Sequence, residues 1–257
     1  MLITLIGAGR VANHLGPALH KAGHRFGQVF SRTMAHASDL AMVLGAEAVD
    51  VPSAIKPGAD LYLCALSDDA LTTVLNDMVS PQWNHPLLVH TAGSLPLSVL
   101  TPYTNRAGVL YPLQTFSPAR QLDMATLPLF VEATDDTTLQ LINTLATDIS
   151  RVVKPLASEE RLTLHLAAVF ACNFVNHLYG VAGSLLEERG LEFSLLLPLI
   201  DETASKVHSL TPREAQTGPA VRNDQRVITK HLQALSQHPE RVALYQLLSE
   251  HIHQQSL

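Results

Sequence analysis

The stretch LITLIGAGRVA, residues 2–12, decides how the first half of the chain folds. The apolar run Leu2–Ile6 predicts a short β-strand, and the residues after it fit G-x-G-x-x-G/A, a pattern that binds dinucleotides when a strand precedes it and a helix follows. Gly7 permits a tight turn, Gly9 lets the backbone approach a diphosphate, and Ala12 lets the helix pack closely on the strand. Free N–H groups at the start of that helix attract phosphate. We therefore predict a cofactor-binding turn, against the alternative of a glycine turn that binds nothing, at Gly7, Gly9, Arg10, Val11 and Ala12.

Short apolar runs alternate with helical patterns from this turn to about residue 154. Strands are expected at residues 2–6, 26–30, 61–66, 87–90, 108–111, 129–133 and 151–154. Helices are expected through Leu15 and Leu19 to Gly23, and at residues 35–44, 71–79 and 137–149. Strands that alternate with helices of this size form parallel sheets with right-handed crossovers. Residues 1–154 are therefore predicted to be an α/β domain built on a Rossmann-type parallel sheet.

The pattern changes at about residue 155, where strand signals vanish. Helices are expected at residues 158–187, 193–209, 223–235 and 239–253. Ser158-Glu159-Glu160 fits a capped start for the first of these helices, and Gly190 follows its end. Residues 155–257 are therefore predicted to form an all-α domain that holds the substrate and joins two subunits.

The composition narrows the classes of function. Hydrophobic residues make up 47% of the 257 residues and charged residues only 16%, which provides for a large core and leaves apolar surface for a second subunit. The net charge of −6 argues against a nucleic-acid partner. The longest unbroken apolar run, residues 166–172, is about a third of a membrane span. We expect a cytoplasmic homodimer, joined through its C-terminal helices, that binds neither nucleic acid nor a membrane.

The two cysteines, Cys64 and Cys172, lie far apart in the sequence. The thirteen histidines show no paired spacing of the kind that holds a metal on one helix. Neither a disulfide framework nor a metal site is expected.

The residues after the second predicted strand favour NADP over NAD. NAD sites usually place Asp or Glu at this point to accept a hydrogen bond from the ribose 2′-hydroxyl. This chain has Ser31, Arg32 and Thr33 instead, and a guanidinium with two hydroxyls suits a 2′-phosphate. We predict that these three residues bind NADP; the alternative is that Arg32 is an ordinary solvated loop arginine.

The ends of the other predicted strands line the same crevice. At the end of the third strand, Leu66 and Ser67 are expected to contact the cofactor, although a helix cap is the stronger interpretation of Ser67. After the fourth strand, His90 and Thr91 are expected near the nicotinamide. For His90, a structural role with its hydrogen bonds satisfied inside the protein is an equally open alternative. After the fifth strand, Gln114 and Thr115 are expected to shape the substrate pocket.

A polar stripe interrupts the apolar helix predicted at residues 158–187. At about 100° per residue, His165, Cys172, Asn176 and Tyr179 share one face, and Asn173 lies at its edge. Buried polar groups need partners, so the stripe should face a polar cavity, a ligand or another subunit. Histidine exchanges protons near neutral pH, and asparagine orients a carbonyl or hydroxyl group. The catalytic candidates are His165, Asn173 and Asn176. The alternative is that the stripe forms a hydrogen-bonded core or a dimer seam.

Several stretches together resemble a family of Rossmann-like oxidoreductases whose helical C-terminal half is a domain of unknown function. They are GAGRVA (7–12), HTAGS (90–94), YPLQTF (111–116), the segment 165–177 and QTGPAVRND (216–224). The resemblance implies a wider superfamily with 6-phosphogluconate, β-hydroxyacid and prephenate dehydrogenases and pyrroline-5-carboxylate reductase. It also implies a nucleotide-binding domain followed by an α-helical domain that often dimerises, with the active site between the two.

One position departs from this superfamily. β-Hydroxyacid dehydrogenases carry K-x-x-x-N on the first long helix of the second domain, and this chain matches the asparagine with Asn173 but has Val169 in place of the lysine. The protonatable residue upstream is His165, which is our candidate acid/base.

We therefore predict an NADP-dependent oxidoreductase that moves a hydride between the nicotinamide and a carbonyl or imine carbon of a small, carboxylated metabolite. Arg222, in the polar loop 215–224, is the candidate anchor for the carboxylate, although Asp224 or Glu202 are equally possible partners. One competing hypothesis, which the missing lysine motivates, is a sensor that binds NADP(H) without turnover. Another is a structural dimer that binds no nucleotide.

Overall fold

The structure, a computed structural model, describes residues 1–80, 83–117 and 122–256. The chain divides into two compact units, Met1–Asn173 and Phe174–Leu257, which are described one at a time. The change in composition at residue 155 coincides with the start of a long helix, which begins at Ser158. The expected division of roles between residues 1–154 and 155–257 stays a prediction.

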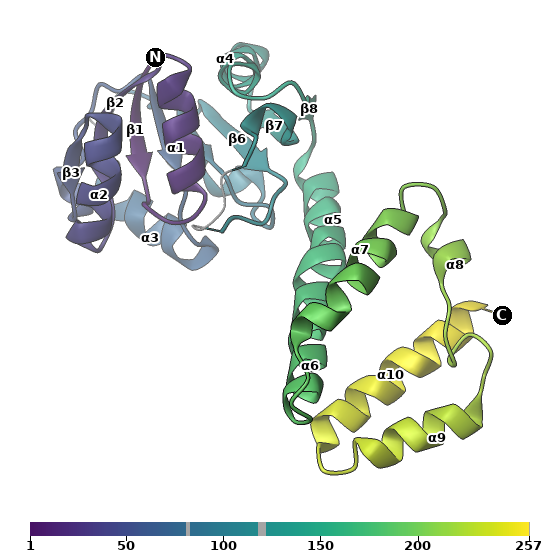
Figure 1. Cartoon of the computed structure of the whole chain (residues 1–257). Coiled ribbons are helices and arrows are strands. Elements are labelled where there is room, and N and C mark those ends of the chain that lie inside the picture. Colours follow the sequence, from purple (N-terminus) through teal and green to yellow (C-terminus); the bar gives the residue numbers. More distant parts are fainter. Residues whose placement is uncertain (81–82, 118–121, 257) are drawn as a thin grey trace. The chain divides into compact units, whose positions relative to one another are not determined.

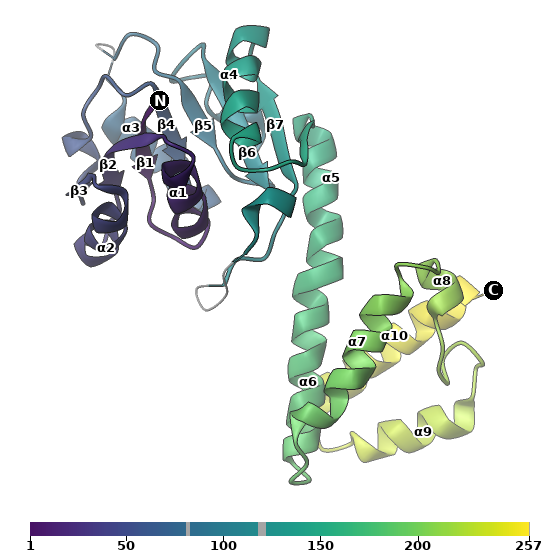
Figure 2. The same ribbon diagram turned by 45° about the horizontal axis from the view of Figure 1, so that its top comes forward.

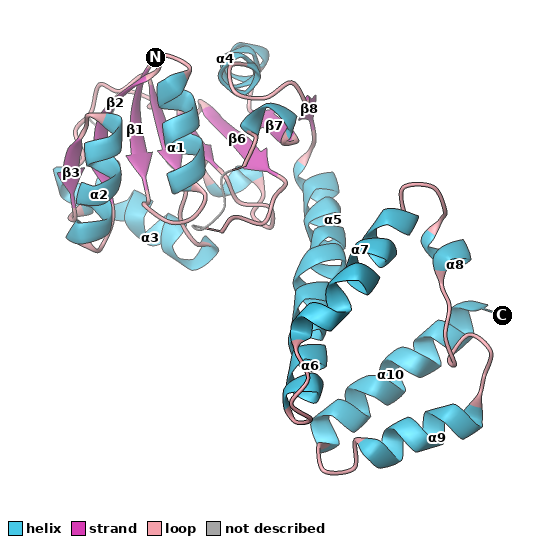
Figure 3. Cartoon of the chain, in the orientation of Figure 1, coloured by secondary structure: helices cyan, strands magenta, loops and turns pink. Residues whose placement is uncertain are grey.

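The first unit is built on an eight-stranded sheet with the order β3-β2-β1-β4-β5-β6-β7-β8 (Figures 1 and 3). The six strands from β3 to β6 run parallel, β7 runs antiparallel to β6, and β8 runs parallel to β7. The bounds are β1 Leu2–Ile6, β2 Arg25–Phe30, β3 Glu47–Val49, β4 Leu61–Cys64, β5 Leu88–His90, β6 Ala107–Pro112, β7 Leu129–Ala133 and β8 Val153–Pro155.

The predicted parallel sheet is confirmed for β3 to β6, whereas β7 and β8 run opposite to these six strands. Parallel neighbours need a crossover connection, which is usually a helix. Between β6 and β7 the described residues contain only the short 3-10 helix η4, Met124–Thr126. The chain therefore returns along the same edge, and β7 pairs antiparallel with β6.

Helices cover both faces of the sheet and enclose two apolar cores (Figures 1 and 2). Alternate residues of β4 show the division: Leu61 and Leu63 belong to one core, and Tyr62 and Cys64 to the other. The first core is covered by α1 (Ala12–Lys21), α2 (Met34–Leu44) and α4 (Asp136–Thr147); the second is covered by α3 (Asp68–Met78) with the 3-10 helices η1 (Pro52–Ala54) and η3 (Leu97–Val99). This sandwich confirms the predicted α/β class and fixes the strand ends where ligands bind in such sheets.

The helix predicted at residues 158–187 is confirmed as a single helix, Ser158–Glu187. It consists of α5 (Ser158–Ala168), the π-helical segment η5 (Val169–Phe174) and α6 (Val175–Glu187). By length and composition alone this helix is apolar enough to cross a membrane, and none of its apolar window is buried within the chain. Core helices of soluble proteins pass the same test, so the finding is weak evidence for a membrane span.

The rest of the second unit is helical, as predicted. Its elements after α6 are η6 (Phe193–Leu196), α7 (Leu197–Lys206), α8 (Pro212–Ala215), α9 (Gln225–Ala234) and α10 (Pro239–Ser256). Two of the described strands and α-helices were not predicted, the edge strand β3 and the single-turn helix α8, because three or four residues carry no measurable periodicity.

Candidate functional site

The glycine turn lies where the strand order of the sheet reverses. The first strand, β1, pairs with β2 on one side and with β4 on the other. Ligands of open α/β sheets bind at the carboxyl ends of the strands on each side of such a reversal. Gly7 has φ +113°, and its N–H donates to the carbonyl oxygen of Phe30 at 2.8 Å. A Cβ atom there would lie 2.3 Å from the carbonyl oxygen of Ala65, so the turn requires glycine.

The start of α1 presents backbone N–H groups beside this turn. After Gly7, the first backbone N–H with a backbone acceptor among the described residues belongs to Asn13, which donates to Gly9 O at 3.0 Å. The Asn13 side chain also donates to the carbonyl oxygens of Ala8 and Gly9, each at 2.9 Å, and so braces the turn. Gly9 is exposed, and a Cβ added there would meet nothing within 4 Å. The N–H groups of residues 9–12 are therefore available to an anion.

The residues after β2 leave room for a phosphate. The N–H of Ser31 donates to Val49 O at 3.1 Å, and the Ser31 hydroxyl accepts from the N–H of Thr33 at 3.3 Å. Arg32 is exposed and forms no ion pair with a described residue. Its guanidinium is therefore free for a ligand, and the assignment of a 2′-phosphate to it stays a prediction.

Leu66 and Ser67 follow β4 at the same edge. Leu66 is half-buried, and Ser67 is the exposed residue at the start of α3. The Ser67 side chain makes no capping hydrogen bond, so its hydroxyl is not committed to the helix. The neighbouring Asp68 instead accepts a hydrogen bond from the hydroxyl of Ser94, which ties the start of α3 to the loop after β5.

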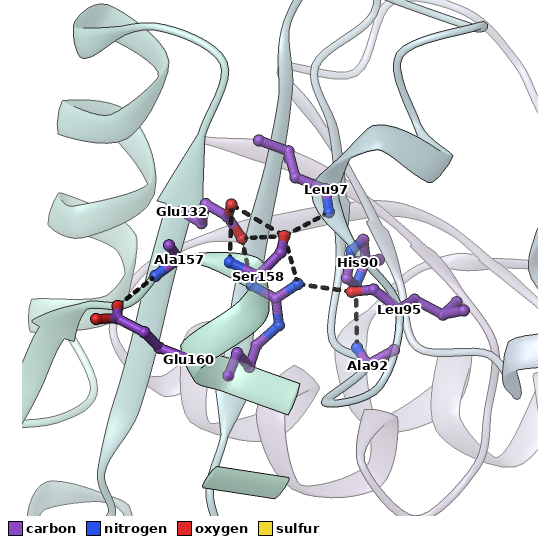
Figure 4. Close-up of polar contacts among 9 residues, drawn as sticks. His90, Ala92, Leu95, Leu97, Glu132, Ala157, Ser158 and Glu160 are labelled. Atoms are coloured by element: carbon purple, nitrogen blue, oxygen red, sulfur yellow. Dashed lines mark hydrogen bonds and ion pairs between the residues drawn. The ribbon is translucent and has the colours of Figure 1, made fainter. Parts of the chain in front are cut away.

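The His90 side chain is closed off from solvent, with only 1% of the residue exposed. Its Nδ1 accepts from the N–H of Ala92 at 3.1 Å, and its Nε2 has no hydrogen-bond partner in the described chain (Figure 4). Burial, and then the nearby charge of Arg161, lower the pKa of His90 to about 4, against a weaker opposing contribution from Pro96. The ring is therefore neutral at physiological pH, and a cofactor would reach the backbone of His90 rather than its side chain.

A pocket of about 650 Å³ brings together many of the predicted site residues of the first unit. The predicted site residues that line it are Arg10, Val11, Thr91, Gln114, Thr115, His165 and Asn173. The other described residues that line it are Gly93, Tyr111, Pro112, Leu113, Phe116, Leu164, Ala167, Ala168, Val169, Ala171 and Cys172. Asn176 and Arg222 belong to the second unit, and their roles stay predictions.

Three residues whose contact was not predicted from the sequence, Gly93, Tyr111 and His165, lie together in the lining of this pocket. The Tyr111 hydroxyl lies 3.1 Å from Nδ1 of His165, and the two rings meet edge to face. A Cβ atom on Gly93 would lie 2.5 Å from that same Nδ1. The sequence feature that could have pointed to Tyr111 is its position at the carboxyl end of a predicted strand. Nothing in the sequence, however, pairs it with a histidine 54 residues later.

The first turn of α5 is tied to the sheet through a buried arginine, Arg161, of which 1% is exposed. Its guanidinium pairs with the carboxylate of Glu132 on β7 and donates to Leu95 O at 2.6 Å. The Ser158 hydroxyl donates to Glu132 at 2.8 Å and accepts from the N–H of Leu97 at 2.9 Å. This network fixes the helix that carries His165 against β7 and the loop after β5.

The pocket-lining part of the helix includes the π-helical segment Val169–Phe174. This segment contains Cys172 and Asn173. Single π-helical turns inside α-helices occur often at functional sites. They also widen the turn, so the face predicted at 100° per residue from His165 to Tyr179 does not continue unchanged through this segment.

A second hollow, of about 1130 Å³, lies beside α1 and shares Ala8, Gly9 and Arg10 with the turn. None of the described residues that line it comes directly after β4 or β5, so this hollow does not extend along the ends of those two strands. Among the described residues, no three His, Cys, Asp or Glu side chains group closely enough to hold a metal ion.

Two family models match the chain. Residues 1–116 match a Rossmann-like domain, and residues 127–252 match the domain of unknown function DUF2520. No curated protein matches the chain in sequence.

Solved structures match over nearly the whole length. The crystal structure of a "putative NADP oxidoreductase" from Bacteroides fragilis is 44% identical, with 98% of each chain covered and a TM-score of 0.94. An imine reductase from Myxococcus stipitatus in complex with NADP+ is 16% identical, with 99% of this chain and 92% of that chain covered and a TM-score of 0.66. Pyrroline carboxylate reductase from Plasmodium falciparum with NADP bound is 11% identical, with 100% and 97% covered and a TM-score of 0.60.

The two more distant structures show a shared fold, and the Bacteroides fragilis protein shows kinship. The chain belongs to the family in which a Rossmann-like domain is followed by DUF2520.

Proposed function

We propose that this protein is an NADP-dependent oxidoreductase that transfers a hydride between the nicotinamide and a carbonyl or imine carbon of a small metabolite. The observation that carries the proposal is the turn at Gly7 and Gly9, whose open N–H groups adjoin a pocket lined by His165. The relatives support it, since the Bacteroides fragilis protein is named as an NADP oxidoreductase and two structures of the same fold hold NADP.

The residues of the turn fit this cofactor. The backbone at Gly9–Ala12 would receive the diphosphate, and Ser31, Arg32 and Thr33 would receive the 2′-phosphate. No carboxylate stands at the end of β2, where one would favour NAD. Leu66, Ser67, Thr91 and the backbone of His90 would continue the contact along the strand ends. When bound, NADP supplies or accepts the hydride.

The pocket residues of this chain handle the proton and the orientation of the substrate. His165 would exchange a proton with the substrate oxygen or nitrogen, and Asn173 and Asn176 would orient the reacting group. Gln114 and Thr115 would shape the wall of the pocket. Arg222 would anchor a carboxylate, because the planar fork of donors on a guanidinium suits that group.

We also propose that the protein is a cytoplasmic homodimer. Along the helix Ser158–Glu187, Leu162 and Leu166 of α5 and Phe170 of η5 recur every four residues and are 50%, 56% and 62% exposed within one chain. An apolar row of this kind is typical of a surface that another subunit covers.

A sensor that binds NADP(H) without turnover is the second candidate. It is favoured by Val169, which lines the pocket at the position where β-hydroxyacid dehydrogenases carry lysine. Both candidates require cofactor binding, so turnover separates them.

The test has two stages. Calorimetric titration with NADPH, NADP+, NADH and NAD+ should show tighter binding of the phosphorylated pair. NADPH should then be consumed when 2-oxo acids, cyclic imines or β-keto acids are added, and His165→Ala should abolish that consumption. Binding without consumption across the panel would favour the sensor, and no binding would contradict both candidates.

A further inference from the structure

We propose that Tyr111 is a positioning residue for His165: its hydroxyl donates to Nδ1 of the ring and so leaves Nε2 to deliver the proton to the substrate. This inference rests on the proposed function, which gives His165 its acid/base role. It adds a residue that neither the sequence pattern nor the family descriptions assign.

The contact between the two side chains is specific in geometry. Tyr111 Oη lies 3.1 Å from His165 Nδ1, within hydrogen-bond range. The ring centroids are 6.0 Å apart and the planes are inclined at 74°, so the rings meet edge to face rather than stack. Tyr111 is buried near the end of β6, and His165 is half-buried one turn after the anchored Arg161 on α5.

A third element, the loop after β5, closes around the pair. A Cβ atom on Gly93 would lie 2.5 Å from His165 Nδ1, 2.8 Å from its Cγ and 2.9 Å from Tyr111 Cε2. Only glycine leaves space for both rings here. The edge of the imidazole that carries Nδ1 therefore lies against Gly93 and Tyr111, and Nε2 is the ring nitrogen that remains for the pocket.

In this arrangement the Tyr111 hydroxyl is the donor of the hydrogen bond. Burial raises the pKa of the Tyr111 phenol, against a smaller lowering by Arg161, so the hydroxyl keeps its proton at neutral pH. The 3.1 Å contact joins Oη and Nδ1, and the tautomer with Nδ1 unprotonated, which accepts from the hydroxyl, is the one proposed here. A phenol that donates to Nδ1 places the proton of the neutral ring on Nε2.

The proton balance of the reduction follows from this arrangement. As the hydride reaches the substrate carbon, the Nε2–H bond of His165 breaks and the proton bonds to the substrate oxygen or nitrogen. The Tyr111 proton moves to Nδ1, so the ring stays neutral, and water later returns a proton to the phenolate. The charge of the buried Arg161 partly offsets the cost that burial imposes on this phenolate while it lasts. In the oxidation direction the same steps run in reverse.

The test compares Tyr111→Phe with wild type. The ¹⁵N resonance of His165 Nδ1 in the neutral ring should move toward that of a nitrogen without a hydrogen bond. The turnover number with NADPH and the best substrate of the panel should fall on the order of tenfold or more. The dissociation constant of NADPH should stay within about twofold, because Tyr111 does not lie at the phosphate-binding turn.

Two further variants keep the result interpretable. Tyr103→Phe is the matched control, because the half-buried Tyr103 donates its hydroxyl to Asn76 at 2.7 Å and does not line the pocket. It should change neither the resonance nor the rate. Gly93→Ala should lower the turnover number with the Tyr111 hydroxyl still present, because the new methyl group displaces the His165 ring.

An unchanged Nδ1 resonance in Tyr111→Phe, or an unchanged turnover number, would overturn the proposal. Failure of the proposed function looks different. A wild-type protein that binds NADPH but consumes none would contradict the oxidoreductase and the catalytic role of the pair together. In that case the NMR comparison would still decide whether Tyr111 holds the ring.

Discussion

At the scale of single residues, Gly7 and Gly9 make separable contributions to the turn after β1. Gly7 is required by the fold, since its φ is +113° and a Cβ would meet the Ala65 carbonyl. Gly9 faces open space, so Gly9→Ala should leave the free energy of unfolding of the apo protein within about 0.5 kcal/mol of wild type. It should nevertheless weaken NADPH binding by about tenfold or more, about 1.4 kcal/mol, because the methyl group occupies the approach of the diphosphate. Gly180→Ala, where a Cβ also meets nothing within 4 Å, is the control, and wild-type affinity in Gly9→Ala would contradict the assignment.

In the proposed site, Arg32 is the residue that decides between the two nicotinamide cofactors. Arg32→Ala should weaken NADPH binding by roughly tenfold to a hundredfold, the effect of losing one or two hydrogen bonds to a charged group. NADH binding should hardly change, because NADH has no phosphate at that position. Calorimetric titration of both nucleotides measures the ratio, and the exposed Arg25 at the start of β2 provides the control Arg25→Ala. Equal weakening of both nucleotides would place Arg32 elsewhere in the site.

His90 should make the stability of the protein depend on pH. Its pKa in the folded chain is about 4, against 6.5 for an ordinary histidine, so the folded state binds the proton less tightly than the unfolded state. The contribution of neutral His90 to the free energy of unfolding is therefore fully present above about pH 6.5. It is lost as the pH falls toward 4, and the total loss is about 3 kcal/mol. Urea unfolding of wild type and His90→Asn at several pH values checks this, since asparagine keeps an acceptor for the Ala92 N–H but does not titrate. If the free energy of unfolding of His90→Asn still fell over this pH range, other groups would be responsible for the pH dependence. His36→Asn, at an exposed position on α2, is the control and should show the same pH dependence as wild type.

At the scale of elements, the buried ion pair between Arg161 and Glu132 joins α5 to β7. Glu132→Gln keeps the size of the side chain but leaves the guanidinium without a counter-charge, which costs about 3–5 kcal/mol when a buried pair is broken. Glu47→Gln is the matched control, because Glu47 pairs with Lys56 on the surface and exposed pairs contribute less than about 1 kcal/mol. Urea unfolding of both variants gives the two values. If Glu132→Gln and Glu47→Gln lowered the free energy of unfolding by similarly small amounts, water would have to reach Arg161.

The sequence predicted the elements of the first unit better than their directions and contacts. Strands β1 and β7 begin and end where the apolar runs do, because burial on a sheet selects those residues. The antiparallel direction of β7 was not predictable in this way, since an apolar run looks the same in a parallel and in an antiparallel strand. Arg161 also escaped notice, because a charged residue on the first turn of a helix usually faces solvent.

The candidate site shows the same limit. The glycine turn carries its own local signature, and the structure places it where the pattern requires. Tyr111, Gly93 and His165 come from three elements, and only tertiary structure brings them together. The π-helical segment at Val169–Phe174 likewise has no sequence signature that would correct a helical wheel.

At the scale of the whole molecule, the exposed row on α5 should decide the oligomeric state. Leu166, at its centre, would be buried once in each subunit of a symmetric dimer, so one substitution acts twice. At about 1.5 kcal/mol for each buried leucine, Leu166→Lys should raise the dissociation constant of the dimer by about a hundredfold or more. Sedimentation velocity over a range of concentrations measures it, with Met42→Lys as control, because Met42 is also exposed but lies on α2.

The same helix is apolar enough to be covered by lipid instead, and the two coverings give opposite results. A dimer keeps its apolar row away from lipid, so wild-type protein should sediment as a dimer and should not float with vesicles of phosphatidylcholine. In Leu166→Lys the monomer should appear at concentrations where wild type is dimeric, while NADPH binding at the Gly7–Ala12 turn persists, because that turn is built entirely within the first unit. A wild-type monomer in solution, or wild-type protein that floats with the vesicles, would show that a second copy is not what covers α5.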